Sequence, residues 1–193
     1  RLNPACLVEL TATPRDNNVL YSVSAAELKS AEMIKLPVVL TEHPDGWQSC
    51  LRDALLQRQQ LELDAQKDPS YIRPILLVQA QAKGGEATVD VVRAHLIQHE
   101  TIPEEQIAVS TGTTKELNDI NLFAPSCPIR VVITVEALKE GWDCSFAYVL
   151  ASLQNMNSAV DVEQLLGRVL RMPYAQKRPV ESLNKAYAHV IAE

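Results

Sequence analysis

The sequence predicts an α/β domain in three layers, with a mainly parallel, open β-sheet at its centre. Short apolar runs alternate along the chain with longer segments that repeat apolar residues at helical spacing, as in successive βαβ units. The run 75–79 (ILLVQ) is almost wholly apolar, as expected of a central parallel strand that is buried on both faces. The segment 45–67 repeats apolar residues about one turn apart, which predicts an amphipathic helix.

The remaining elements follow the same two patterns. Apolar residues recur on one helical face in 87–98 and in 160–170, and Pro173 closes the second of these helices. A further short helix is expected from Lys115. The other predicted strands are 5–10, 33–40 (interrupted by Pro37), 107–110, 129–134, 146–150 and 187–191, and the predicted loops are 64–74 and 121–128.

Length, charge and cysteine usage narrow the class of protein. The 193 residues suffice for one domain with a tail. The chain has 18 basic and 24 acidic residues, a net charge of −6, so we expect it to share nucleic acid with a partner domain rather than grip it alone. The four cysteines form no CxxC pair, which predicts reduced, packed thiols in a cytoplasmic protein. No apolar run reaches the roughly 18 residues of a membrane helix, and we expect no membrane contact.

The strongest functional signal is the octapeptide 164–171, QLLGRVLR. In a helix, steps of four and three residues would place Gln164, Arg168 and Arg171 on one face. Arginine offers a planar, permanently charged fork that matches phosphate oxygens. A solvated polar face is the alternative, but the apolar flanks indicate a well-packed helix that presents its arginines outward, as an arginine finger requires.

Polar residues also follow the predicted strands, where parallel sheets place their ligands. Gln79 ends one strand, and Thr111 and Thr113 follow the next. Their amides and hydroxyls are suited to a nucleic-acid backbone, although ordinary turns and helix caps use the same residues.

Two stretches resemble known motifs. QLLGRVLR resembles the sixth motif of superfamily-two helicases, QxxGRxxR, and residues 133–150, which include ALKEGWDC, resemble the fifth motif as it occurs in type III restriction subunits. The resemblance implies a RecA-like domain. It also implies that Arg168 and Arg171 reach the γ-phosphate of the nucleotide and that Gln164 couples the nucleotide to domain closure.

The same resemblance assigns roles to residues of the fifth motif. Gly141 and Asp143 would contact the sugar of the nucleotide or the motif arginines. Thr134 would touch the nucleic-acid backbone, although its separation from Gly141 is one residue longer than in the commonest pattern. Without the resemblance, Gly141 and Asp143 would be read as a structural turn.

The resemblance also divides the chain. Residues 11–14, TATP, resemble the third motif, which ends a first RecA-like domain. We therefore expect residues 1–20 to be the tail of that first domain, residues 21–44 an extended interdomain segment, and residues 45–193 the second RecA-like domain. No GxxxxGK[ST] or DExH pattern occurs in the chain. Lys83-Gly84-Gly85 is interpreted as a turn rather than a phosphate loop.

The implied activity is ATP-dependent translocation on DNA by a type III restriction subunit, inactive without its first domain. ATP and Mg²⁺ would bind mainly to that first domain. The implied partners are double-stranded DNA, the first RecA-like domain and a modification methyltransferase subunit, and a nuclease domain would follow residue 193. Two alternatives stay open, namely a DNA or RNA helicase outside restriction and an assembly module that does not serve ATP. The four histidines form no metal-ligand pattern.

Overall fold

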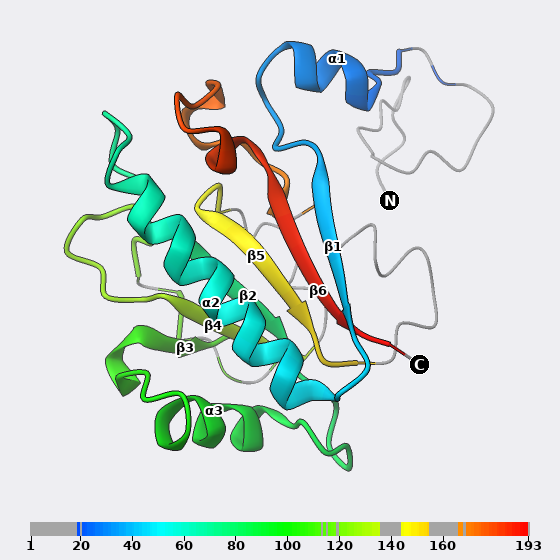
Figure 1. The fold of residues 1–193 in the computed structure, drawn as a ribbon, viewed down its shortest axis with the longest axis vertical. Helices are drawn as coiled ribbons and strands as arrows, with labels where there is room; N and C mark the ends of the chain where they lie inside the picture. The colour runs from blue at the N-terminus through cyan, green and yellow to red at the C-terminus, as the bar shows by residue number, and fades with distance from the viewer. Residues whose placement is uncertain are drawn as a thin grey trace, which may run out of the picture.

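Six parallel strands form one sheet at the centre of the protein (Figure 1). The computed structural model describes residues 19, 21–112, 114, 116–118, 120–135, 144–154, 166–167 and 169–192. The strands, in their spatial order, are β1 (Val38–His43), β6 (Ala186–Ile191), β5 (Ala147–Ser152), β2 (Ile75–Gln79), β4 (Val131–Thr134) and β3 (Ile107–Val109). Each of the five pairings is parallel, as the sequence predicts.

The two long helices lie on one face of the sheet. α2 (Trp47–Ala65) crosses β6, β5 and β2, and α3 (Val89–Gln98) lies beside it (Figure 1). Gly46 is the N-cap residue of α2, and its φ of 92° is favourable for glycine and strained for other residues. The chain steps in one direction across the sheet as far as β3 and then reverses. This strand order, with all pairings parallel and helices packed on the sheet, is that of a three-layer α/β domain of the RecA-like kind.

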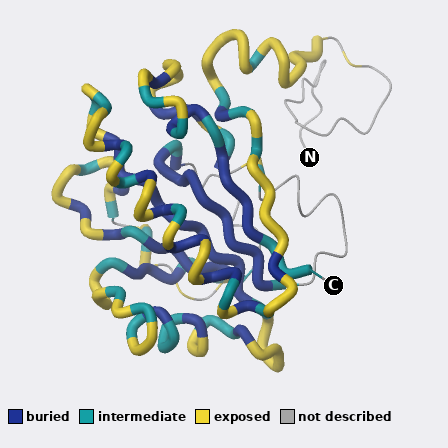
Figure 2. The backbone as a smooth tube through the Cα atoms, in the orientation of Figure 1, coloured by how far each residue is buried: buried dark blue, intermediate teal, exposed yellow. Residues whose placement is uncertain are grey.

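The core is the central part of this sheet. Every residue of β2, β4 and β5 is buried, whereas residues 39–42 of the edge strand β1 are exposed (Figure 2). β1 belongs to the segment 21–44, which was predicted to lie between two domains, and it pairs with β6 in register from Val38↔Ala186 onward. The segment also contains α1 (Ala25–Ser30), which a Ser24–Glu27 capping box starts.

Several local elements differ from those predicted from the sequence. Residues 116–118, where a short helix was expected from Lys115, form a turn. Three 3-10 helices were not predicted: Glu104–Gln106, Pro173–Ala175 and Glu181–Asn184. The predicted strand 5–10, the TATP residues 11–14 and most of the predicted helix 160–170 lie outside the described residues. Cys50, Cys127 and Cys144 are buried free thiols, as predicted.

The two predicted loops are joined by a buried arginine. Arg73, at the end of the first loop, is 1% exposed. Its guanidinium donates to the carbonyl oxygens of Ala124 (2.9 Å), Cys127 (2.7 Å) and Leu122 in the second loop. These three turn-forming carbonyl groups would otherwise need water, so this single side chain supplies the hydrogen-bond partners that a sheet or helix would give.

Candidate functional site

Three polar side chains lie in one row at the carboxyl ends of the central strands. Gln79 of β2 is in register with Thr134 of β4 and with Ser152 of β5. Paired residues of parallel strands point to the same face, and here it is the face opposite α2. The Ser152 hydroxyl donates to the Gln79 carboxamide oxygen over 2.8 Å, and both side chains are buried.

This row lies where the chain changes sides of the sheet. From β2 the chain steps outward to β3 at one edge of the sheet, whereas from β4 and β5 it steps back toward β6. In open α/β sheets such a switch point forms the ligand-binding crevice, at the carboxyl ends of the strands. The structure places Gln79 and Thr134 side by side at this edge, in agreement with their predicted positions at the ends of strands.

Two further glutamines tie the strand ends together. Gln154 Nε2 donates to the carbonyl oxygens of Ala80 and Val135, each over 2.7 Å. Gln81 Nε2 donates to Leu153 O over 2.8 Å. Ser152 and Gln154 are not among the residues predicted from the sequence. The signal was present, because both are polar residues at the end of a buried strand, the same pattern that drew attention to Gln79.

Gln81 also shapes the exposed turn at residues 82–86, which follows β2. The Gln81 carboxamide oxygen accepts the backbone N–H of Ala87 over 3.0 Å, and the peptide N–H of Gln81 donates to Ala87 O over 2.8 Å. Gly84 has a φ of 99°, and Gly85 packs against the Gln81 side chain. The motif Lys83-Gly84-Gly85 therefore forms a turn, as interpreted from the sequence.

Replacing Gly85 with alanine is expected to destabilise the protein by about 1–3 kcal/mol, the usual cost of overpacking. The added methyl carbon would lie 2.7 Å from Gln81 Cβ, so the Gln81 side chain would have to move from its partners. Chemical denaturation of both variants measures the effect. Gly112→Ala is the matched control, because a Cβ at Gly112 meets no atom within 4 Å. Equal stability of the two variants would contradict this role for Gln81.

Thr111 lies at the same edge, after β3. Its peptide N–H donates to Thr114 O over 2.8 Å, and its hydroxyl oxygen accepts the N–H of Thr114 over 3.1 Å, which makes a local turn. The side chain is half-buried. Thr113, the other residue predicted here, lies outside the described residues.

Arg171 departs from the geometry expected of it. The sequence places it on one helical face with Gln164 and Arg168, but the backbone of Arg171 forms an antiparallel β-bridge with Ile34. The helix ends before it, because the carbonyl and amide groups on either side of Arg171 pair with residues 33 and 35 instead of continuing the helical ladder. The side chain of Arg171 is exposed. Gln164, Arg168, Gly141 and Asp143 lie outside the described residues.

The structure separates Arg171 from the polar row. The Arg171 segment is held near Ser145 and Ala147, where β5 begins, whereas Ser152 ends the same strand. Five residues of extended chain span roughly 17 Å. Arg171 and the strand-end residues Gln79 and Thr134 therefore belong to two separate places on the domain.

The chain matches no family model and no curated protein. Among the residues that the structure describes, no helix has the length and apolar character needed to span a membrane. In the same part of the chain, no group of three or more His, Cys, Asp or Glu side chains is placed to hold a metal ion.

Proposed function

We propose that this chain is the second RecA-like domain of a superfamily-two, ATP-driven DNA translocase of the type III restriction kind. The observation that carries the proposal is Arg171. It ends the sequence QLLGRVLR, its guanidinium is on an exposed side chain, and its backbone is fixed to the domain by the bridge to Ile34. A finger that stabilises a transferring phosphoryl group needs this combination of a rigid base and an exposed, permanently charged tip.

ATP and Mg²⁺ would bind mainly to a first RecA-like domain that carries the phosphate loop. This chain contains no GxxxxGK[ST] sequence, so its contribution would be to close the nucleotide cleft with Arg171 and Arg168. Gln164, Gly141 and Asp143 would complete that side of the cleft, as the motif resemblance implies. A modification methyltransferase subunit and a nuclease domain would supply site recognition and cleavage.

The DNA backbone would pass over the carboxyl edge of the sheet. Gln79 and Thr134 are 7% and 1% exposed. Their role in this proposal is therefore to hold the strand ends in place beneath the surface that the DNA would contact. Two of the described residues that reach the surface there are Thr111, which is half-buried, and Lys83, which is exposed in the turn after β2. A hydroxyl and an ammonium group are both donors suited to phosphate oxygens.

We expect the chain by itself to bind double-stranded DNA weakly, with a shallow salt dependence. One neutralised phosphate contributes a slope of about −0.9 in log K against log salt concentration, so Lys83→Gln is expected to reduce the slope by about one. A fluorescence titration between 0.05 and 0.2 M salt, a range in which affinities remain measurable, provides the test.

Lys67→Gln is the control for this titration, because Lys67 follows α2 at the other end of the sheet and pairs with Asp64. Equal slopes for Lys83→Gln and Lys67→Gln would contradict the path over the carboxyl edge. Nanomolar binding near 0.15 M salt would show that the DNA surface lies elsewhere on the chain.

A further inference from the structure

The backbone of Arg171 is held by the segment that precedes β1. The Lys35 N–H donates to Leu170 O over 2.6 Å, and the Met172 N–H donates to Met33 O over 2.9 Å. These two bonds enclose the bridge between Ile34 and Arg171. Residues more than 130 positions apart in the sequence therefore form a short antiparallel pair, with the arginine at its centre.

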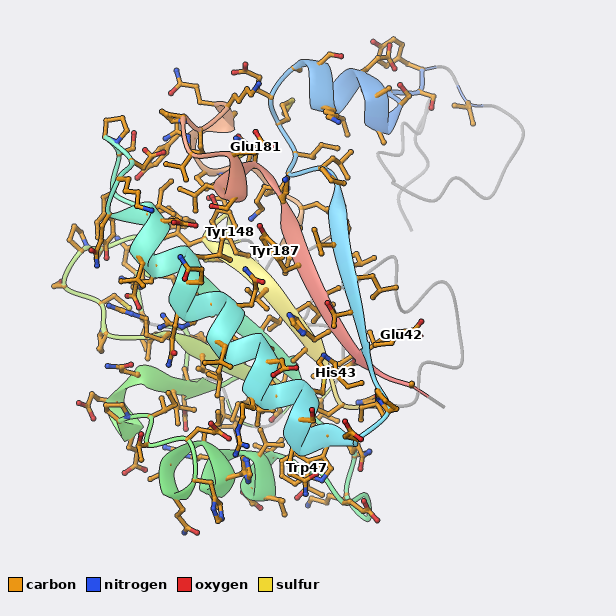
Figure 3. All side chains as sticks on the ribbon, in the orientation of Figure 1. Glu42, His43, Trp47, Tyr148, Glu181 and Tyr187 are labelled. Atoms are coloured by element: carbon orange, nitrogen blue, oxygen red, sulfur yellow. The ribbon has the colours of Figure 1, made fainter. Side chains whose placement is uncertain are left out.

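The side chain of Lys35 fixes this pair to the sheet. Its exposed fraction is zero, and its Nζ donates to Ala147 O over 2.6 Å and to Ser145 O over 3.0 Å. Nζ also lies 3.9 Å from the centroid of the Tyr148 ring. Tyr148 stands near the start of β5 in Figure 3. Two carbonyl oxygens and a ring face therefore lie within reach of the hydrogens on this amine.

Burying a lysine at this position is energetically unfavourable. Burial lowers the pKa of Lys35 well below its ordinary value, although the nearby Cys144 thiol partly opposes the shift. A methionine would fill nearly the same volume without an amine to desolvate. Packing alone therefore gives no reason for an amine here, whereas its directed bonds hold the Met33–Lys35 segment at one position along β5.

The chain is also constrained just after Arg171. Tyr174 and Ala175 have φ values of 59° and 46°, a region that non-glycine residues adopt only when their surroundings require it. The Tyr174 hydroxyl donates to Tyr71 O over 2.6 Å, and the Arg178 guanidinium lies 5.7 Å from the Tyr174 ring. The turn that follows Arg171 is therefore anchored independently of Lys35.

We propose that Lys35 is a positioning residue for Arg171, because it links the segment before β1, the arginine segment and the start of β5 through one buried side chain. This inference rests on the proposed function of Arg171. It assigns a role in catalysis to the segment between the two domains. Movement of that segment would shift the base of the finger, because the two share a β-bridge.

The test is a double-mutant cycle in the complete ATPase, with Lys35→Met and Arg171→Ala. Lys35→Met is expected to lower kcat on the order of 10²-fold, the effect of about 1 Å of misplacement, and to change KM much less. In the Arg171→Ala protein, the same substitution is expected to have little further effect, because its target is gone. Lys29→Met is the control, since Lys29 is an exposed lysine of the same segment and is expected to leave kcat unchanged.

Amide hydrogen exchange on the same variants provides a readout that does not depend on turnover. Lys35→Met is expected to accelerate exchange at the N–H groups of residues 35 and 172, while the amides of β2 keep their protection. An equal loss of kcat in both backgrounds, or unchanged exchange at residue 172, would overturn the inference while leaving the proposed function intact. Normal turnover of the Arg171→Ala protein would overturn the proposed function itself, and the inference with it.

Discussion

Under the proposed function, replacing Arg171 with lysine in the complete ATPase is expected to lower DNA-stimulated turnover on the order of 10³-fold or more. Arginine fingers contribute that much because their planar fork meets two phosphoryl oxygens at once, and an ammonium keeps the charge without the fork. ATP binding should change less than turnover, because most of the nucleotide contacts would lie on the first domain. Thermal stability should change by about 1 kcal/mol or less, because the Arg171 side chain is exposed.

The informative comparison for Arg171→Lys is turnover against melting temperature in one preparation. Arg52→Lys is the matched control, because the Arg52 side chain is 60% exposed and forms an ordinary ion pair with Glu100 on the helical face of the sheet. Both variants should melt like the parent, and the control alone should keep its ATPase. Near-normal turnover of a folded Arg171→Lys protein would remove Arg171 from the set of catalytic residues.

Acidification is expected to destabilise the protein through a buried histidine pair. His43 ends β1 and stands near the first turns of α2 in Figure 3. His43 Nε2 and His189 Nδ1 lie 3.0 Å apart, and both residues are buried. Burial lowers the pKa of His189 from 6.5 to about 4, and the neighbouring His43 is the second cause of this shift. Asp53 of α2, whose carboxylate lies 3.5 Å from His43 Nδ1, opposes the shift only in part.

The direction of the effect follows from the depressed pKa of His189. Above pH 6.5 the residue is neutral in both states, and its titration does not affect folding. Between pH 6.5 and about 4, the unfolded chain binds a proton that the folded chain does not, so stability falls as the pH falls. The full loss is about 3 kcal/mol, on the order of 1.4 kcal/mol for each unit of pKa difference.

Urea denaturation at pH 7.5 and pH 4.5 measures this loss in the parent, in His189→Gln and in the control His99→Gln. The difference in unfolding free energy between the two pH values is expected to be much smaller in His189→Gln than in the parent. Substitution of the exposed His99 should leave that difference unchanged. If the parent and His189→Gln lose the same stability on acidification, the histidine pair is not the cause. Carboxylates that titrate in this range contribute equally to all three proteins, so the comparison isolates His189.

Local patterns in the sequence determined the fold class and most elements of the domain. The strand 75–79 was predicted with the bounds it has, because a strand buried on both faces must be apolar throughout. The helix predicted over 45–67 is α2, because its apolar spacing reports the face that packs on the sheet. Gln79 was predicted at the carboxyl edge of the sheet and lies there, because the carboxyl ends of parallel strands coincide.

Contacts between distant segments were decided only by the tertiary structure. The bridge between Ile34 and Arg171, the burial of Lys35 beneath it and the pairing of His43 with His189 each join residues more than 100 positions apart. They depend on β6 being inserted between β1 and β5, an order that no local pattern contains. Arg171 lies outside the helix predicted for it because its backbone pairs with the distant residue Ile34. The periodicity of a helix reports which residues can share a face, but its last residue is set by the hydrogen-bond partners that the rest of the fold provides.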